Sequence, residues 1–276
     1  MFVYEEYMRE EMFPLIWCKG CGNGIITKSI LRAIDRLKIQ KDDVAMVSGI
    51  GCAGRLPGYV DFNTLHTTHG RPLAFATGVK LARPELKVIV ITGDGDGLAI
   101  GGNHFIHACR RNIDVPCILF NNATYGMTGG QVAPTTPMGM WASTMPYGQM
   151  EPSFDACKLA EAAGASFVAR GTTYHAVALE KLIVEAIQHP GFSFLEVITD
   201  CPEIYGRKNK LGDPADMLLA QKDKVVPIDQ QGRYTPEQLA GKVFTKILHK
   251  HEATEYTARY QQLIDRVKVE GNGHAL

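Results

Sequence analysis

The chain has 276 residues, equal numbers of acidic and basic side chains and a pI near 7.1; 45% of its residues are hydrophobic and 21% are charged. A chain of this length and hydrophobicity buries a substantial core, which excludes disorder as its main state. Balanced charge argues against a protein that mainly holds nucleic acid or an anionic membrane, and no apolar run approaches the roughly 18 residues needed to span a bilayer.

The N-terminus, MFVYEEYMREEM, is acidic and lacks the basic start and apolar centre of a signal peptide. We therefore expect a cytoplasmic protein. In a reducing compartment the seven cysteines are expected to be thiols or metal ligands rather than disulfides.

Strands and helices alternate along most of the chain. The helical periodicity of apolar residues and the short β-branched runs predict these elements in turn. The expected helices are 24–37, 71–82, 98–110, 154–163 and 175–189, and the expected strands are 44–47, 87–92, 115–121, 166–169 and 193–198. This alternation predicts an α/β fold, a parallel sheet with helices on both faces.

Two stretches depart from this alternation. Residues 122–152 are polar and rich in Pro and Gly, and so long an irregular stretch is usually functional or disordered. After residue 202, a basic irregular part is followed by amphipathic patterns that predict helices at 236–250 and 254–269. We therefore predict a catalytic domain over 1–202 and a C-terminal helical extension over 203–276 that contacts a partner subunit, although the segment 205–226 is equally compatible with a solvated loop.

The most informative motif is Gly93-Asp94-Gly95-Asp96-Gly97, which stands between a predicted strand and a predicted helix. Ligands of open α/β sheets bind beyond the carboxyl ends of the strands, where glycines allow close approach and a helix N-terminus attracts anions. An aspartate at such a place indicates a divalent cation with oxygen ligands. The next strand ends at Asn122, so both side chains are expected at one sheet edge; the alternative is that both motifs are only turns.

Four of the cysteines stand where a sheet edge would gather them. Cys18 and Cys21 form a CxxC pair, Cys52 lies in a glycine turn after the first strand, and Cys201 follows the last strand and precedes a proline. Four thiolates suit a [4Fe–4S] cluster or zinc. The spacing alone leaves cluster, zinc and buried thiols open. The other three cysteines lie in apolar contexts and are predicted to be core residues: Cys109, Cys117 and Cys157.

Taken together, the motifs resemble the β subunits of 2-oxoacid:ferredoxin oxidoreductases. GDG followed after about 25 residues by NN is similar to the diphosphate-and-magnesium motif of thiamine diphosphate enzymes. WCxGCG, GIGC, THGR, YGMTGGQ and a late Cys-Pro occur in the family's order over residues 15–210. One departure is Lys19, where proline is common, and it lies between the cysteines without replacing either.

The resemblance implies the diphosphate-binding half of the thiamine diphosphate fold and a set of site residues. Mg²⁺ would be held by Asp94, Asn122 and the carbonyl of Thr124. The [4Fe–4S] ligands would be Cys18, Cys21, Cys52 and Cys201. The contacts to thiamine diphosphate would come from Ile50, Gly51, Cys52, Ala53, His69, Gly95, Asp96, Gly126 and Met127. The alternative for His69 is a hydrogen-bonding residue at a helix N-terminus.

The resemblance also implies an activity and partners. The expected reaction is the reversible, coenzyme A-dependent oxidative decarboxylation of 2-oxoglutarate to succinyl-CoA and CO₂, with electrons passing through the cluster to ferredoxin. The activating glutamate of thiamine enzymes lies in a pyrimidine-binding domain for which this chain has no room. We therefore expect it from an α subunit, in an (αβ)₂ heterotetramer that is active only when assembled.

Substrate choice depends on the YGMTGGQ loop, which resembles the 2-oxoglutarate and branched-chain types, whereas pyruvate enzymes tend to carry asparagine at the position of Met127. The alternatives are a branched-chain or aryl 2-oxoacid, a non-redox thiamine diphosphate lyase, or an interaction subunit that holds zinc or an iron–sulfur site structurally and binds no thiamine.

Overall fold

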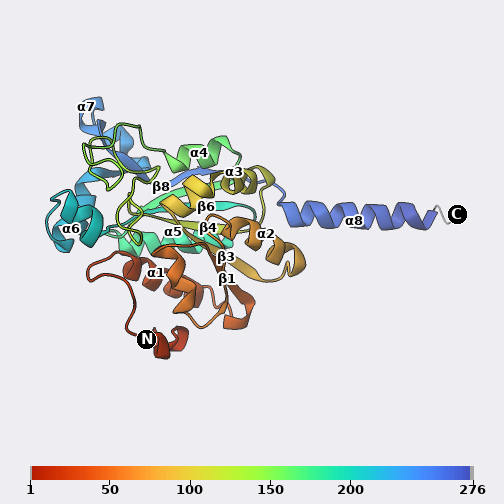
Figure 1. The fold of residues 1–276 in the computed structure, drawn as a ribbon. Coiled ribbons are helices and arrows are strands. Elements are labelled where there is room, and N and C mark those ends of the chain that lie inside the picture. Colours follow the sequence, from red (N-terminus) through yellow and green to blue (C-terminus); the bar gives the residue numbers. More distant parts are fainter. Residues whose placement is uncertain (1, 274–276) are drawn as a thin grey trace.

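A computed structural model describes residues 2–273 and shows an eight-stranded sheet between two layers of helices (Figure 1). The strands are β1 (Val44–Ser48), β2 (Asn63–His66), β3 (Lys87–Gly93), β4 (Pro116–Asn121), β5 (Phe167–Thr172), β6 (Ser193–Ile198), β7 (Val225–Pro227) and β8 (Val243–Lys250). The helices are α1 (Asn23–Arg36), α2 (Pro72–Ala82), α3 (Gly102–Arg111), α4 (Ala156–Ala162), α5 (Ala176–Gln188), α6 (Pro214–Lys224), α7 (Pro236–Leu239) and α8 (Tyr256–Gly273).

The sheet has the order β2-β1-β3-β4-β6-β5-β8-β7. The first six strands in this order are parallel to one another, and β8 runs antiparallel to β5. The predicted α/β fold is therefore confirmed. Because the chain leaves β1 for β2 on one side and later places β3 on the other, the direction of strand order reverses at β1 and β3. Such a reversal is where ligands bind in open α/β sheets.

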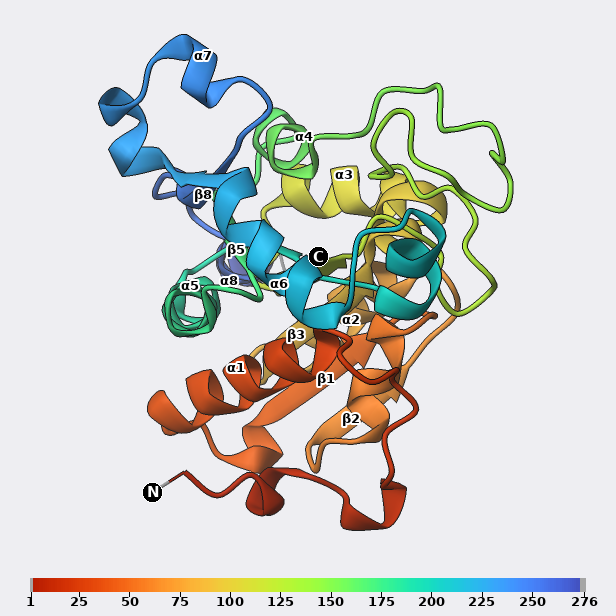
Figure 2. The ribbon, with the colours of Figure 1, turned by 90° about the vertical axis from the view of Figure 1, so that its left-hand side faces the viewer.

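The central strands are apolar throughout because both of their faces are covered. On one face, α1 and α5 pack on side chains such as Ile89 and Ile118. On the other face, α2, α3 and α4 pack on Val88 and Leu119. Figure 2 shows these two helical layers on either side of the sheet. This double cover holds the strand ends, and the turns that follow them, in fixed positions.

The C-terminal part differs from its prediction. The predicted helix over 236–250 is wrong for its second half: α7 ends after one turn, Gly241 takes a φ of +74°, and β8 pairs with β5. A glycine in this left-handed conformation ends a helix readily, and the free edge of β5 supplies hydrogen bonds that a local pattern does not reveal. The segment 205–226, predicted as irregular, contains α6, which begins at an Asp213 capping box.

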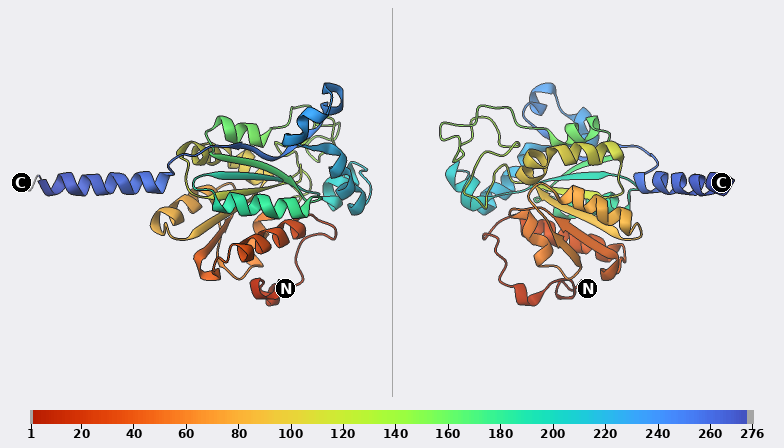
Figure 3. Two further views of the ribbon diagram at one scale, coloured as in Figure 1. Left: turned by 180° about the vertical axis from the view of Figure 1, so that it is seen from behind. Right: turned by 45° about the vertical axis from the view of Figure 1, so that its right-hand side comes forward.

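The last helix of the chain extends away from the sheet. Figure 3 shows α8 projecting from the body on both views, so the prediction of a helix over 254–269 is confirmed. The boundary proposed at residue 202 stays a prediction, although β7 and β8 join the same sheet as the strands before it. Within residues 2–273, none of the helices combines the length and apolar character that crossing a bilayer requires.

Candidate cofactor and metal site

A cleft opens at the carboxyl ends of β1, β3 and β4. It is formed by the turns that follow these three strands, together with the loop after β2 and the start of α1. All of the residues predicted to contact thiamine diphosphate or Mg²⁺ line this cleft. They are Ile50, Gly51, Cys52, Ala53, His69, Asp94, Gly95, Asp96, Asn122, Thr124, Gly126 and Met127.

Asp94 begins the turn after β3 and is almost fully buried, with 3% of its surface exposed. Its Oδ1 accepts a hydrogen bond from the Gly95 N–H at 2.8 Å, and its Oδ2 accepts one from the Thr135 hydroxyl at 2.8 Å. Burial raises the pKa of this carboxyl to about 6, although these hydrogen bonds act in the opposite direction. A buried carboxylate of this kind is stabilised by a nearby cation.

The other two predicted magnesium ligands stand on the turn after β4. The N–H of Thr124 donates to Asn122 Oδ1 at 3.3 Å, and Ala123 between them takes a φ of +59°. Thr124 is buried, and the backbone of this turn also hydrogen bonds to Asp94. The donor set is a carboxylate, an amide oxygen and a backbone carbonyl. These are the hard oxygen ligands that Mg²⁺ prefers, so the residues present fit this ion.

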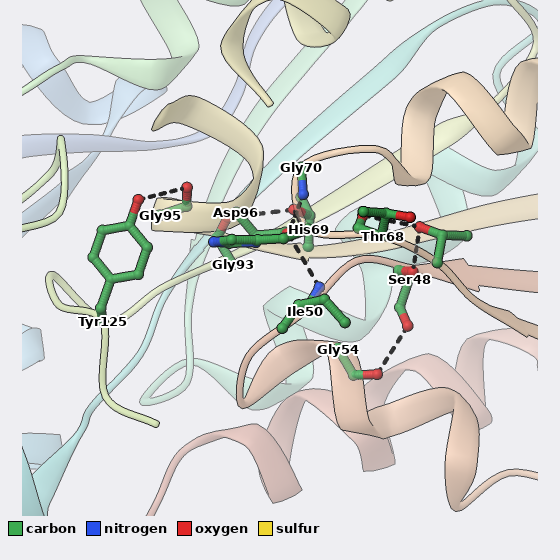
Figure 4. A network of polar contacts seen from close by, with 12 residues as sticks. Ser48, Ile50, Gly54, Thr68, His69, Gly70, Gly93, Gly95, Asp96 and Tyr125 are labelled. Carbon is green, nitrogen blue, oxygen red and sulfur yellow. Dashed lines mark hydrogen bonds and ion pairs between the residues drawn. The ribbon is translucent and has the colours of Figure 1, made fainter. Parts of the chain in front are cut away.

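Asp96 organises the cleft through its side chain (Figure 4). Its Oδ1 accepts from the N–H groups of Ile50 at 3.1 Å and Gly70 at 2.7 Å, and lies 2.6 Å from His69 Nδ1. Its Oδ2 accepts from the Thr92 hydroxyl at 2.6 Å. The carboxylate thus ties together the turns after β1 and β3 and the loop before α2. It also makes Nδ1 the protonated nitrogen of His69 and leaves Nε2 available.

Two glycines are required by close contacts around this network. A Cβ on Gly49 would overlap the carboxylate of Asp96. A Cβ on Gly95 would lie 2.8 Å from Tyr125 Cδ1 and closer still to the next two ring atoms. The Tyr125 hydroxyl donates to the Gly95 carbonyl at 3.0 Å, which fastens the turn after β4 onto the turn after β3.

Five residues that line the cleft were absent from the prediction: Asn23, Gly93, Phe120, Tyr125 and Thr128. Tyr125 and Thr128 belong to the YGMTGGQ motif, which was recognised only for its role in substrate choice. Asn23 follows WCKGCG directly. The signal for all three was their place beside a recognised motif.

The cysteine group lies next to the cleft. A Cβ on Gly126 would lie 3.3 Å from Cys201 Sγ and 3.8 Å from Cys52 Sγ, so these two sulfurs share one neighbour. Trp17 Nε1 donates to the Cys52 carbonyl at 2.7 Å and holds the N-terminal segment, with its CxxC pair, against the turn after β1.

The thiols of this group influence one another. Burial, reinforced by the neighbouring cysteines, raises the pKa of Cys21 to about 12 and that of Cys52 to about 11. Burial also raises the pKa of Cys201. Such thiols ionise when a metal centre supplies positive charge, so their chemistry fits a thiolate-bound cluster.

The described range contains no three His, Cys, Asp or Glu side chains that converge on a single metal ion. The assignment of the four cysteines to one cluster therefore stays a prediction. The three cysteines predicted as core residues, Cys109, Cys117 and Cys157, are buried as expected.

Comparison with known proteins gives consistent matches. Residues 49–197 match the family model described as the thiamine pyrophosphate enzyme, C-terminal TPP binding domain. The chain is 50% identical to the 2-oxoglutarate synthase subunit KorB of Methanocaldococcus jannaschii over 265 residues, which cover 96% of this chain and 98% of the relative. It is 58% identical to the KorB subunit of Archaeoglobus fulgidus over 220 residues, or 80% of each chain.

A solved structure is also similar. The 2-oxoglutarate:ferredoxin oxidoreductase from Magnetococcus marinus, with 2-oxoglutarate, coenzyme A and succinyl-CoA bound, matches with a TM-score of 0.86 and 33% identity. The match covers 97% of this chain and 91% of that chain. The likeness therefore extends over nearly the whole chain rather than over the motifs alone.

Proposed function

Because this chain belongs to the family of 2-oxoacid:ferredoxin oxidoreductase β subunits, of the 2-oxoglutarate type, we propose that its cleft holds thiamine diphosphate and Mg²⁺ beside a [4Fe–4S] cluster. The chain is a subunit of an oxidoreductase complex. The proposed reaction is the coenzyme A-dependent oxidative decarboxylation of 2-oxoglutarate to succinyl-CoA and CO₂, and its reverse, with electrons passing to ferredoxin. The ligands bound in the solved relative favour 2-oxoglutarate over branched-chain and aryl 2-oxoacids.

The observation that carries this proposal is the convergence of the residues predicted to contact thiamine diphosphate or Mg²⁺. They come from separate turns after β1, β3 and β4 and from the loop after β2, yet all of them line one cleft. A chance set of turn residues would be spread over the carboxyl edge of the sheet. The convergence lies at the reversal of strand order, where the fold itself favours ligand binding.

The proposed roles follow from the chemistry of each residue. Asp94, Asn122 and the Thr124 carbonyl would hold Mg²⁺, which pairs with the diphosphate. Thiamine diphosphate, when bound, supplies the nucleophilic carbon for attack on the 2-oxoacid. His69 would present Nε2 to the bound ligand, in an orientation that Asp96 fixes. The cysteines Cys18, Cys21, Cys52 and Cys201 would hold the cluster close enough to the cleft to accept electrons.

The partner follows from the carboxylates of the cleft. The two that line it, Asp94 and Asp96, are both engaged by protein donors. We propose that the activating glutamate comes from an α subunit, as the subunit naming of the relatives suggests. The complete enzyme would be an (αβ)₂ heterotetramer that delivers electrons to ferredoxin.

The test is an anaerobic purification of the chain with its α subunit, followed by iron analysis, visible absorbance and EPR. We expect a brown protein whose cluster is reduced by 2-oxoglutarate and coenzyme A. Cys201→Ser should lose iron, whereas Cys109→Ala, which removes a core cysteine outside the site, should keep it. A brown protein that responds only to another 2-oxoacid would change the substrate, and a colourless, iron-free protein would favour a non-redox thiamine enzyme.

A further inference from the structure

Asn23 is a buried polar residue with neither end of its side chain satisfied. Within residues 2–273, the buried side-chain atoms without a hydrogen-bond partner are Asn23 Oδ1, Asn23 Nδ2, Asn112 Nδ2 and Thr199 Oγ1. Asn23 is the member of this set that lines the cofactor cleft, and only 1% of its surface is exposed. An amide buried in this way is costly unless something bound in the cleft completes its hydrogen bonds.

Asn23 stands where the backbone favours negative charge. It is the first residue of the 14-residue helix α1, which begins after Gly22 and has no side-chain cap. The Asn23 N–H hydrogen bonds to the sulfur of Cys21. The positive end of the helix dipole is therefore directed at the cysteine group, where added negative charge is favoured.

The start of α1 is also held in place. A Cβ on Gly22 would overlap Thr199 Oγ1, and the Gly22 N–H donates to the Asp200 carbonyl at 3.4 Å. A shift of the backbone at the start of α1 would break this contact with the segment after β6 that carries Cys201. Its side chain lines the cleft together with Cys52 and Gly126.

We propose that Asn23 Nδ2 donates a hydrogen bond to an anionic acceptor bound at this place, and that this contact tunes electron transfer or substrate binding. The inference rests on the proposed function. In either case an electron-rich atom accepts a hydrogen bond from the amide N–H of Asn23. Two sources supply such an atom: a sulfur of the cluster held by Cys21 and Cys52, or an oxygen of the 2-oxoacid.

The two sources predict different effects. A hydrogen bond to a cluster sulfur stabilises the reduced cluster, so its removal moves the midpoint potential to more negative values. A hydrogen bond to a charged substrate oxygen contributes to binding, so its removal lowers kcat/KM for 2-oxoglutarate by roughly tenfold to a hundredfold. A residue that only supports the fold would move neither quantity selectively.

The experiment compares variants in the αβ complex purified anaerobically. Asn23→Leu has a similar size and removes both polar ends, and Asn23→Asp keeps the shape but replaces the donor by an acceptor. Ser29→Ala is the matched control, because Ser29 is buried on the same helix and bonds only to the Ile25 carbonyl. The readouts are the cluster midpoint potential from an EPR-monitored dithionite titration and the KM and kcat for 2-oxoglutarate.

Both positive outcomes support the proposal. A more negative potential in both Asn23 variants, with KM unchanged, identifies the cluster as the acceptor. A lower kcat/KM at an unchanged potential identifies the substrate. If the wild-type complex contains its cluster and turns over 2-oxoglutarate while both variants match Ser29→Ala, the proposal is overturned.

Two controls separate other failures. A wild-type complex without cluster or turnover refutes the proposed function itself. If Asn23→Leu does not fold, Asn23→Ala and Asn23→Asp carry the same comparison, because both remove the amide donor.

Discussion

Gly95 and Tyr125 form a contact whose energy depends on both residues. In the wild-type background, a Cβ on Gly95 would overlap the Tyr125 ring, so the ring would have to move on the order of 1 Å to reach ordinary van der Waals separation. That movement strains the turn after β4 and weakens the hydrogen bond from the Tyr125 hydroxyl to the Gly95 carbonyl. We expect Gly95→Ala to destabilise the chain by about 1–3 kcal/mol, the usual cost of overpacking.

The same substitution should behave differently once the ring is gone. Gly95 has no positive φ and begins a helical turn, where alanine is favoured over glycine. In a Tyr125→Ala background, Gly95→Ala should therefore be neutral or stabilise by up to about 1 kcal/mol. The coupling between the two positions is then about 1–4 kcal/mol and is the signature of a direct contact.

The assay is a double-mutant cycle in the αβ complex, with melting temperature and thiamine diphosphate affinity measured in the presence of Mg²⁺. One kcal/mol corresponds to about 2–4 °C in a chain of this size. Gly102→Ala is a suitable control, because a Cβ there meets no neighbouring atom. An equal loss from Gly95→Ala in both backgrounds, or no loss in either, would refute the contact as the cause.

Three further predictions concern charge and anchoring. Burial raises the pKa of Asp94 from 3.8 to about 6, so the ionised form that would bind Mg²⁺ is lost as the pH falls through 6. Titration calorimetry should show Mg²⁺-dependent thiamine diphosphate affinity falling about tenfold per pH unit below 6. Without metal the sign is opposite, because the raised pKa adds stability that is present below pH 3.8 and lost as the pH rises through 6, and a melting-temperature series against pH checks this. Trp17→Phe removes the hydrogen bond to the Cys52 carbonyl, so we expect a loss of about 0.5–1.5 kcal/mol and faster amide exchange in the N-terminal segment. Arg170→Met leaves Glu196 buried without its ion partner and should cost about 3–5 kcal/mol, whereas adding Glu196→Leu should recover part of the melting temperature.

The site could be predicted from the sequence where its polar residues follow the ends of parallel strands. Asp94 and Asn122 were expected together because each follows an apolar strand, and parallel strands align their carboxyl ends at one edge. The structure places both on the wall of one cleft. The identity of strands such as β3 and β4 is visible in the sequence because they are buried on both faces.

The parts that were missed depend on contacts between distant segments. β2 is polar and mostly exposed at the sheet edge, so no hydrophobic pattern marks it. β8 has apolar residues that also fit a helix, and only the open edge of β5 decides its conformation. The packing of Tyr125 on Gly95 and the isolation of the Asn23 amide arise from loops that meet in space, which spacing along the chain does not encode.

Gly126 gives the two proposed centres a common wall. The turn from Asn122 to Met127 carries two of the proposed magnesium ligands at its beginning, and its Gly126 lies close to the sulfurs of Cys52 and Cys201. A ligand that orders the turn at Asn122 would therefore also order it at Gly126, four residues along the backbone. Binding of the proposed cofactor at one end and of the proposed cluster at the other would then be thermodynamically linked, and any gain in affinity that one gives the other would be returned by the same factor. Oxidative damage to the sulfurs would then weaken the retention of the cofactor, and loss of the cofactor would weaken the binding of the cluster.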